Sequence, residues 1–268
     1  MKIIDGKMIS NLIKQEIKSE VDQIIKNGER VPHLAAVLVG NDGASLTYVG
    51  SKVRSCEQVG FDSTLVKLPD DISQNDLLLK IEDLNNDDKI DGFIVQLPLP
   101  KHIDEDKVLM AVNPNKDVDG FHPTNFGKMA LNMETFIPAT PYGIIELLKR
   151  YNINTSGKNT VVIGRSNIVG RPISILMSRK GNPGDSTVTL VHSRTNNLEN
   201  FTKTNLEEVE KKFKEQDTFI VENIGNAPDV EQINTAFTDI DSRLVICEGK
   251  LEKLNLSKSS SSLPPSSK

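Results

Sequence analysis

The sequence predicts an α/β protein built from two domains. Short apolar runs, suited to buried strands, alternate along the chain with longer stretches whose apolar residues recur every three or four positions, as in helices. This alternation is typical of parallel sheets that are covered by helices. The 268 residues are enough for two modest domains, each with its own core.

The first half of the chain alternates helix and strand from its start. An amphipathic stripe of Met, Leu, Ile and Val between Met8 and Ile25 predicts the first helix, and the apolar run 33–40 predicts the first strand. The other predicted helices are 44–58, 75–84 and 102–112, and the other predicted strands are 63–68 and 90–97. A loop rich in carboxylates follows over 115–123.

The second half begins with an extended, proline-stiffened segment over 136–141. Thr140 is the expected N-cap of the next helix, over 142–151, with Pro141 at its first position. A polar link then leads to the strand Val161-Val162-Ile163, a turn, a helix that Gly170 opens, and a second strand over 187–192. Further along we expect a charged helix over 206–216, strands over 218–221 and 244–247, and a serine-rich, flexible end over 251–268.

The turn after Ile163 has the composition of an anion site. Gly164 and Gly170 would let the backbone approach a ligand closely, and the free N–H groups of the following helix would favour a phosphate. Arg165, Ser166 and Arg171 add charge and hydrogen-bond donors. The spacing is not G-x-G-x-x-G, so an ordinary turn with a solvated arginine pair is the alternative.

The end of the next strand carries Ser193 and Arg194. In a doubly wound sheet this end lies beside the adenosine ribose of a bound dinucleotide, where enzymes selective for NAD place a carboxylate. A serine and an arginine suit a 2′-phosphate instead, and therefore NADP. The alternative is that Arg194 is an ordinary surface charge.

The predicted helix 44–58 holds Tyr48 and Lys52, which share a face because they are four residues apart. A lysine held beside an aromatic hydroxyl in a partly desolvated site could exchange protons near neutral pH. From the spacing alone, a solvated helix face is the simpler interpretation. Gln96 is a polar amide at the end of an apolar strand, and it would need either loop backbone or a ligand as its partner.

Composition excludes several other classes of function. The net charge of −5 leaves no basic footprint for nucleic acid. Cys56 and Cys247 make neither a disulfide framework nor a metal cluster, and the four histidines form no ligand motif. No apolar run approaches the length that spans a membrane, so we expect a cytoplasmic protein without a metal.

Five short motifs taken together resemble the bifunctional methylenetetrahydrofolate dehydrogenase/cyclohydrolase family. They are Tyr48-x-x-x-Lys52, Gln96-Leu97-Pro98-Leu99-Pro100, Lys116-Asp117-Val118-Asp119-Gly120-Phe121, Pro138-Ala139-Thr140-Pro141 and Gly164-Arg165-Ser166 with Val169-Gly170-x-Pro172. Each is weak alone, but their order and spacing are specific. The resemblance is close from residue 1 to about residue 195.

The resemblance implies a fold of two α/β domains flanking a cleft, with folate in the cleft and NADP on a Rossmann-like second domain. On this basis we expect a folate-binding catalytic domain over 1–140 and an NADP-binding domain over 141–250, followed by the tail 251–268. The family is commonly a dimer through its cofactor domain, so a homodimer is expected.

The resemblance also implies roles for individual residues. Lys52 would be the acid/base of methenyl hydrolysis, Tyr48 would pack on the folate ring, Gln96 would support Lys52, and Asp119 would bind the pterin nitrogens. Leu97 and Pro98 belong to the same substrate-binding segment. The residues expected to bind the cofactor are Gly164, Arg165, Ser166, Val169, Gly170, Pro172, Ser193 and Arg194.

The sequence departs from the family mainly at its C-terminal end. Ala139 stands where the family often has cysteine, which should matter little. Cys247 stands where an aspartate is usual, and 251–268 does not resemble the Pro/Gly-rich loop and final helix of the family. The alternatives are a natural end lost by frameshift or gene divergence, a diverged paralogue that binds folate or nucleotide without turnover or retains only cyclohydrolase activity, and a wrongly determined C-terminal sequence.

Overall fold

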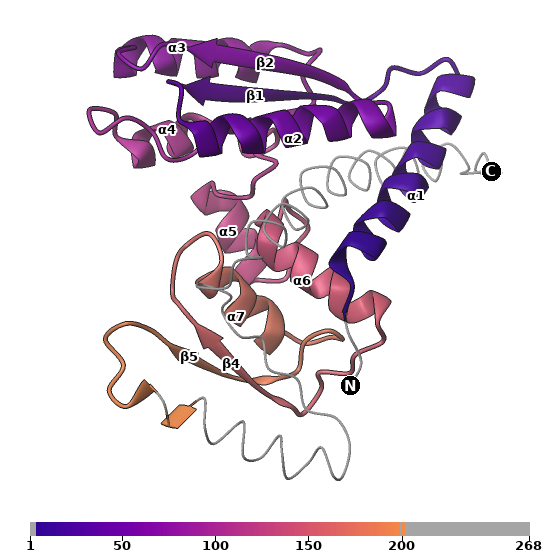
Figure 1. Cartoon of the computed structure of the whole chain (residues 1–268), viewed down its shortest axis with the longest axis vertical. Coiled ribbons are helices and arrows are strands. Elements are labelled where there is room, and N and C mark those ends of the chain that lie inside the picture. The colour runs from indigo at the N-terminus through magenta and orange to yellow at the C-terminus, as the bar shows by residue number, and fades with distance from the viewer. Residues whose placement is uncertain (1–3, 199, 202–268) are drawn as a thin grey trace, which may run out of the picture. The chain divides into compact units, whose positions relative to one another are not determined.

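The computed structural model describes residues 4–198 and 200–201, which fall into two compact units (Figure 1). One unit contains residues 11–118, and the other contains residues 4–10 together with 119–201. The helix predicted over 206–216, the strands predicted over 218–221 and 244–247, and the tail 251–268 lie outside the described residues. The predicted domain limits, 1–140 and 141–250, stay a prediction.

The first unit is a parallel three-stranded sheet with helices on both faces, as predicted. Its strands are β1 (His33–Val39), β2 (Asp62–Leu68) and β3 (Gly92–Val95), in the order β2-β1-β3. Its helices are most of α1 (Gly6–Lys26), α2 (Gly43–Val59), α3 (Gln74–Asn86) and α4 (Glu105–Ala111). Both neighbours of β1 run parallel to it, which confirms the expected α/β class.

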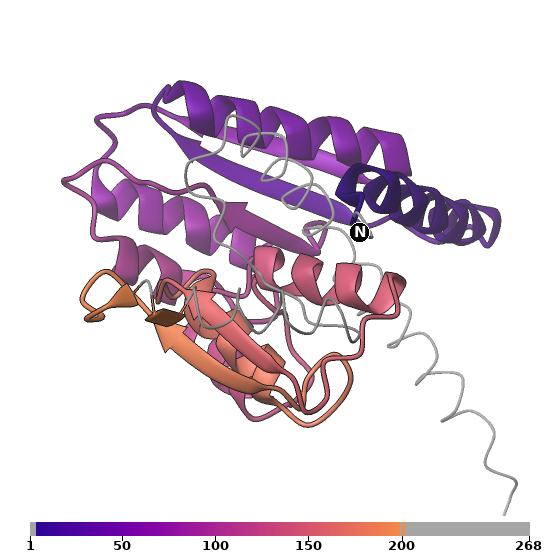
Figure 2. The same cartoon turned by 60° about the horizontal axis from the view of Figure 1, so that its bottom comes forward.

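The alternation of β1 divides the core of this unit between the two faces of the sheet. Ala35, Val37 and Val39 point to one face and are buried there. That face is covered by residues of α3, β3 and α4, among them Leu77, Ile81, Phe93, Val95 and Val108. Helix α2 packs on β1 and β2 and runs along the other side of the strands (Figure 2).

The ends of α2 are determined by Asp42 and Gly60. A carboxylate oxygen of Asp42 accepts a hydrogen bond from the Ser45 N–H at 2.8 Å, which satisfies one of the free donors of the first turn. At the other end Gly60 adopts a left-handed φ of 86°, and its N–H donates to the Cys56 carbonyl at 2.9 Å. These two caps therefore set the limits of α2.

The second unit has a pair of parallel strands and three helices. The strands are β4 (Asn159–Ile163) and β5 (Thr187–Val191), and the helices are α5 (Pro123–Ala130), α6 (Ala139–Arg150) and α7 (Gly170–Ser178). Their buried residues form one core: Met129, Ile145, Leu148, Ile153, Val162, Ile173, Leu176 and Met177. None of the described helices of either unit is long and apolar enough to cross a membrane.

One helix of this unit was missed by the sequence prediction, and the N-cap predicted for another was wrong. Helix α5 was not predicted, although Pro123 stands in its first turn. Its N-cap is His122, a residue type that is unusual at this position, and the His122 Nδ1 accepts a hydrogen bond from the Thr124 N–H at 3.1 Å. Helix α6 begins at Ala139, so Thr140 is not its N-cap. The first bond is accepted instead by the backbone carbonyl of Pro138, from Tyr142 N–H at 3.0 Å.

The cap of α2 generates a testable prediction about pH and stability. Hydrogen bonds from Ser45, the backbone N–H above all, hold the pKa of Asp42 below its ordinary value of 3.8. With a lowered folded-state pKa, the stabilisation is complete above the ordinary value and is lost as pH falls through the folded-state pKa. We expect Asp42→Ala to lower the free energy of unfolding near neutral pH, as measured by urea unfolding. The difference from the wild type should shrink only when the pH falls below the ordinary pKa of 3.8. Asp42→Asn, which can still cap, should unfold like the wild type near neutral pH.

Candidate active site

Helix α2 places Tyr48 and Lys52 on the side of the helix that faces the protein. Lys52 lies on the buried stripe of the helix with Val49, Cys56 and Val59, and its residue is only 7% exposed. Tyr48 is half-buried. Burying an ammonium group costs free energy, and lysines are seldom buried unless their charge is paired. The solvated helix face that the spacing alone favoured is therefore excluded for Lys52.

Gln96 follows directly after β3 and lies at the carboxyl edge of the first sheet. Its N–H continues the ladder to the Val37 carbonyl at 2.9 Å, and its side-chain amide donates to the Leu97 carbonyl at 2.7 Å. Helix α2 begins just after β1, the strand beside β3, so Gln96 and the start of α2 belong to the same edge. In open α/β sheets this edge is where ligands bind.

The segment after Gln96 is held in place by α4. Glu105 accepts a hydrogen bond from the Leu99 N–H at 3.1 Å, and Leu99 itself is buried. Leu97 is half-buried and Pro98 is exposed, with a cis peptide bond between them. Leu97 and Pro98 are thus presented by a backbone that is tied to the sheet on one side and to α4 on the other.

The carboxylate loop brings Asp117 and Asp119 into buried positions, with exposed fractions of 5% and 8%. The loop is built by close backbone approaches. A Cβ at residue 92 would overlap the side chain of Val118, and a Cβ at residue 120, where φ is 64°, would lie 2.8 Å from the backbone of Phe136 and Ile137. Only glycine fits at these two points. The sequence assigned a role to Asp119 but none to Asp117, for which burial is a signal that only the structure provides.

In the second unit, the turn between β4 and α7 differs from the expected anion site in one respect. Ser166 Oγ accepts from the N–H groups of Val169 at 3.0 Å and of Gly170 at 3.3 Å, and the Ser166 carbonyl accepts from Arg171 N–H at 3.0 Å. Pro172 has no N–H to offer. The predicted free N–H groups of the helix end are therefore already used, and a phosphate here would meet side chains rather than open amides.

The side chains at this edge are exposed and come from two neighbouring strands. Ile163 pairs with Val191, and the Gly164 N–H donates to the Val191 carbonyl at 2.8 Å. Arg165 and Ser166 leave β4 at the same edge at which Ser193 and Arg194 leave β5, and all four are exposed. Gly164 has a φ of 118°, and Gly170 packs directly on it. The register thus brings together the residues that the sequence assigned to a nucleotide.

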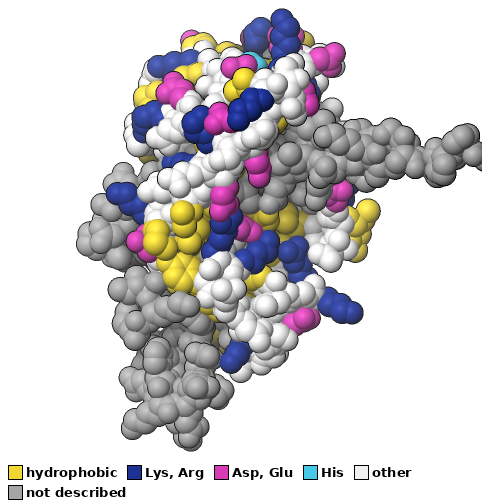
Figure 3. All heavy atoms as spheres, turned by 90° about the vertical axis from the view of Figure 1, so that its right-hand side faces the viewer, with side chains coloured by type: hydrophobic (Ala, Val, Ile, Leu, Met, Phe, Trp, Pro, Cys, Tyr) yellow, Lys and Arg dark blue, Asp and Glu magenta, His cyan; other side chains and the backbone are white. Residues whose placement is uncertain are grey.

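Two observations describe the charged side chains of the described residues. No group of three or more His, Cys, Asp or Glu residues within the described ranges could hold a metal ion. On the face drawn in Figure 3, Lys and Arg side chains are interspersed with Asp and Glu. The chemistry available at the first sheet edge is therefore that of a buried lysine, a phenol, an amide and, further along the chain, buried carboxylates.

Both parts of the chain match models of one protein family. Residues 4–119 match the model described as tetrahydrofolate dehydrogenase/cyclohydrolase, catalytic domain. Residues 138–206 match the model of the NAD(P)-binding domain of the same family.

Individual relatives extend this finding. The bifunctional protein FolD of Flavobacterium johnsoniae is 71% identical over 203 residues, which cover 76% of this chain and 69% of that protein. The crystal structure of the bifunctional enzyme FolD, methylenetetrahydrofolate dehydrogenase/cyclohydrolase, from Campylobacter jejuni is 45% identical, with a TM-score of 0.70, and the match covers 74% of this chain and 69% of that chain. The methylenetetrahydrofolate dehydrogenase-cyclohydrolase of Trypanosoma brucei, solved with NADP cofactor and inhibitor, shares the fold at 23% identity and a TM-score of 0.73, over 93% of this chain and 98% of that chain.

The close packing at Gly170 predicts opposite effects for two glycine substitutions. A Cβ at residue 170 would lie 2.6 Å from the Gly164 carbonyl carbon and 2.9 Å from Arg165 Cα, so Gly170→Ala should cost about 2 kcal/mol of stability. Gly127, inside α5, has open space around such an atom, and Gly127→Ala should gain about 0.5 kcal/mol. Urea unfolding measures both changes. A Gly170→Ala protein as stable as the wild type would contradict the packing described here.

Proposed function

The chain belongs to the tetrahydrofolate dehydrogenase/cyclohydrolase family, and from this premise we propose how its residues carry out the two reactions of that family. The enzyme oxidises methylenetetrahydrofolate to methenyltetrahydrofolate with NADP and hydrolyses the product to 10-formyltetrahydrofolate. The assignment of roles rests on one observation: Lys52 is buried on α2, one helical turn from Tyr48.

Lys52 is the proton-transfer group of the hydrolysis. Water adds to the cationic methenyl carbon and loses a proton, and the bond from that carbon to N5 then breaks as N5 takes up a proton. A single amine can accept the first proton and return the second, because the two steps occur at neighbouring atoms. Tyr48, one helical turn away on α2, packs on the folate ring and orients the reacting carbon.

The other groups proposed to bind folate are the side chains of Asp119, Gln96, Leu97 and Pro98. The carboxylate of Asp119 accepts hydrogen bonds from the amino group and a ring nitrogen of the pterin, a geometry that suits two acceptor oxygens. Gln96 supports the Lys52 amine, and Leu97 and Pro98 line the substrate. The buried position of Asp119 supports this role, since a carboxylate there has little solvent to compete with a ligand.

The dehydrogenase step needs no strong acid from the protein. NADP held by the residues after β4 and β5 would supply the hydride acceptor for the methylene carbon, and the folate nitrogen would donate its electron pair as the hydride leaves. The chain's contribution is to hold the two molecules in contact. Ser166 can donate its own hydroxyl hydrogen to a phosphate oxygen while it caps α7, because a hydroxyl accepts and donates at once.

The residues of the second unit suit the phosphates of that nucleotide. Exposed Arg165 and Arg194 supply charge, Ser193 supplies a donor, and Gly164 and Gly170 keep the turn compact. Val169 and Pro172 complete the segment at the start of α7. Because Arg194 follows β5, we assign it to the 2′-phosphate that distinguishes NADP from NAD.

Two wider properties follow the family and the substrates. We propose that the enzyme acts in the cytoplasm, where folates and nicotinamide nucleotides are dissolved, and that it is a homodimer through its nucleotide-binding part. It would then supply 10-formyltetrahydrofolate to one-carbon metabolism.

Removal of the Lys52 amine tests the hydrolytic mechanism. In Lys52→Ala we expect the rate of methenyltetrahydrofolate hydrolysis to fall by about 10² to 10⁴, the usual contribution of a proton-transfer group. The decay of methenyl absorbance measures the rate, and Lys18→Ala, which alters an exposed lysine of α1, serves as a control. Unchanged hydrolysis in the Lys52 variant would refute its role.

The cofactor assignment is tested by assaying the full chain with methylenetetrahydrofolate and either NADP or NAD. The wild type should form methenyltetrahydrofolate faster with NADP. In Arg194→Ala we expect the KM for NADP to rise by roughly tenfold or more, because charge-assisted bonds to a phosphate are lost, while the KM for NAD changes little. An equal loss for both nucleotides would show that Arg194 does not read the 2′-phosphate.

A further inference from the structure

We propose that Lys116 and Asn85 form a clamp that fixes the carboxylate loop to the end of α3 and so positions Asp119 for the substrate. The proposal rests on the folate-binding role given above to Asp119. Lys116 and Asn85 are positioning residues in this account, since neither needs to touch the folate. Lys116 lies in the carboxylate loop of residues 115–123, and Asn85 holds residues 111 and 113, which lead from the end of α4 into that loop.

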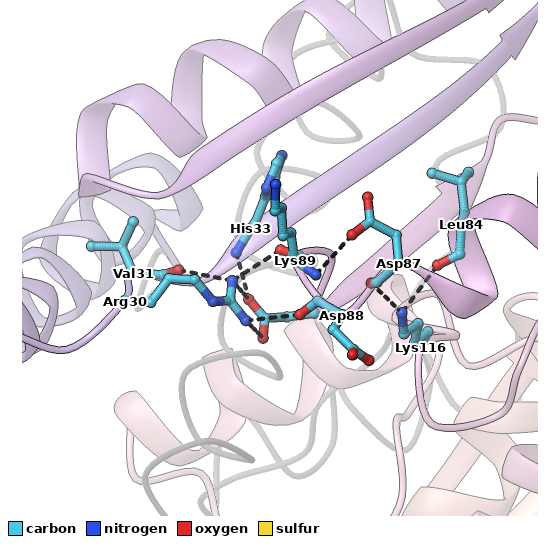
Figure 4. A network of polar contacts seen from close by, with 9 residues as sticks. Arg30, Val31, His33, Leu84, Asp87, Asp88, Lys89 and Lys116 are labelled. Carbon is cyan, nitrogen blue, oxygen red and sulfur yellow. Dashed lines mark hydrogen bonds and ion pairs between the residues drawn. The ribbon is translucent and has the colours of Figure 1, made fainter.

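Lys116 binds the last turn of α3. Its ammonium nitrogen lies 3.0 Å from the Leu84 carbonyl oxygen and 2.7 Å from the Asp87 carbonyl oxygen (Figure 4). Carbonyls at the end of a helix have no partner within the helix and carry its partial negative charge. A lysine that donates to two of them is therefore held at a defined place by both hydrogen bonding and charge.

Asn85 binds the segment that leads from α4 into this loop. Its side-chain amide donates to the Ala111 carbonyl at 2.8 Å and accepts from the Asn113 N–H at 2.8 Å. The loop closes on itself through the Lys116 N–H, which donates to the Asn113 carbonyl at 2.8 Å. The end of α3 thus grips the loop at two points, one by a neutral amide and one by a cation.

Beyond the clamp, the backbone fits closely against β3. The Phe93 N–H donates to the Lys116 carbonyl at 2.9 Å, and Phe93 forms a parallel bridge with Asp117. Val118 is fully buried over Gly92, where no larger residue fits. Asp119 is the next residue, and Gly120 is again confined by neighbouring backbone. A shift of the loop would therefore be passed to Asp119 directly.

The turn between α3 and β3 is held independently from its opposite side. The guanidinium of Arg30 donates two bonds of 2.8 Å to the carboxylate of Asp91 and one of 2.9 Å to the Lys89 carbonyl (Figure 4). The hydrogen bonds that Arg30 donates to the Asp91 carboxylate raise the pKa of Arg30 above its ordinary value. The hydrogen bonds of Arg30 described here reach Asp88, Lys89 and Asp91 of this turn, so Arg30→Met loosens the turn from that side and serves as a matched control for Lys116.

The test compares substrate affinity in Lys116→Met with that in the wild type. We expect the KM for methylenetetrahydrofolate and for methenyltetrahydrofolate to rise together by roughly tenfold, because a displaced Asp119 carboxylate loses hydrogen bonds to the pterin, while the KM for NADP stays unchanged. Asn85→Ala should act in the same direction without any change of charge. Lys116→Arg, which keeps donors for both carbonyls, should restore most of the affinity.

Two further variants separate the clamp from general loosening and from the role of Asp119. Arg30→Met should lower the melting temperature without raising either folate KM, and an equal rise in that variant would overturn the clamp. Asp119→Ala should raise both folate KM values. If it does but Lys116→Met and Asn85→Ala do not, the clamp is refuted and the role of Asp119 stands; if Asp119→Ala has no effect, the role and the clamp fall together.

Discussion

The parallel pairing of neighbouring strands is the constraint on which both candidate sites depend. In a parallel pair, the carboxyl ends of two strands meet at one edge, so residues that are far apart in sequence leave the sheet together. In the first sheet this brings Gln96 to the edge where α2 begins, and in the second it brings Arg165 beside Ser193. Antiparallel pairing would send one member of each pair to the opposite edge.

Glycine and burial convert this edge into a defined site. Gly92 and Gly120 let backbone segments touch on either side of Asp119, and Gly170 does the same for α7 and its preceding turn. Each contact fixes the position of one backbone segment against another, with no side chain between them. Packing also fixes Lys52, because it lies on the buried stripe of α2 and has little access to water.

Apolar runs and turn residues in the sequence were sufficient to predict the strands and helices of the first sheet. β1, β2 and α2 lie within two residues of the predicted limits, because β1 is an uninterrupted apolar run that ends at Gly40 and α2 ends before Gly60. The prediction failed where non-repeating contacts decide the structure. His122 is a rare cap, α6 starts from a backbone carbonyl rather than from Thr140, and the donors of α7 are taken by Ser166. The roles of Lys52 and Asp119 came from a resemblance of motifs, since their burial depends on packing that spacing alone does not encode.

The two sites differ in how affinity is coupled to stability. At the proposed nucleotide edge, Ser166 already accepts from the N–H groups at the start of α7, so we expect binding strength to depend on exposed side chains such as Arg165 and Arg194, which are not part of the core. Selectivity between nucleotides can therefore change by substitution there at little cost in folding free energy. In the proposed folate site, Lys52 and Asp119 are buried, and the segment that leads to Asp119 is held by the hydrogen bonds of Lys116 and Asn85. A change that moves Lys52 disturbs the packing of α2, and a change that moves Asp119 disturbs those bonds. We therefore expect activity and stability to vary together in the proposed folate site and separately at the proposed nucleotide edge.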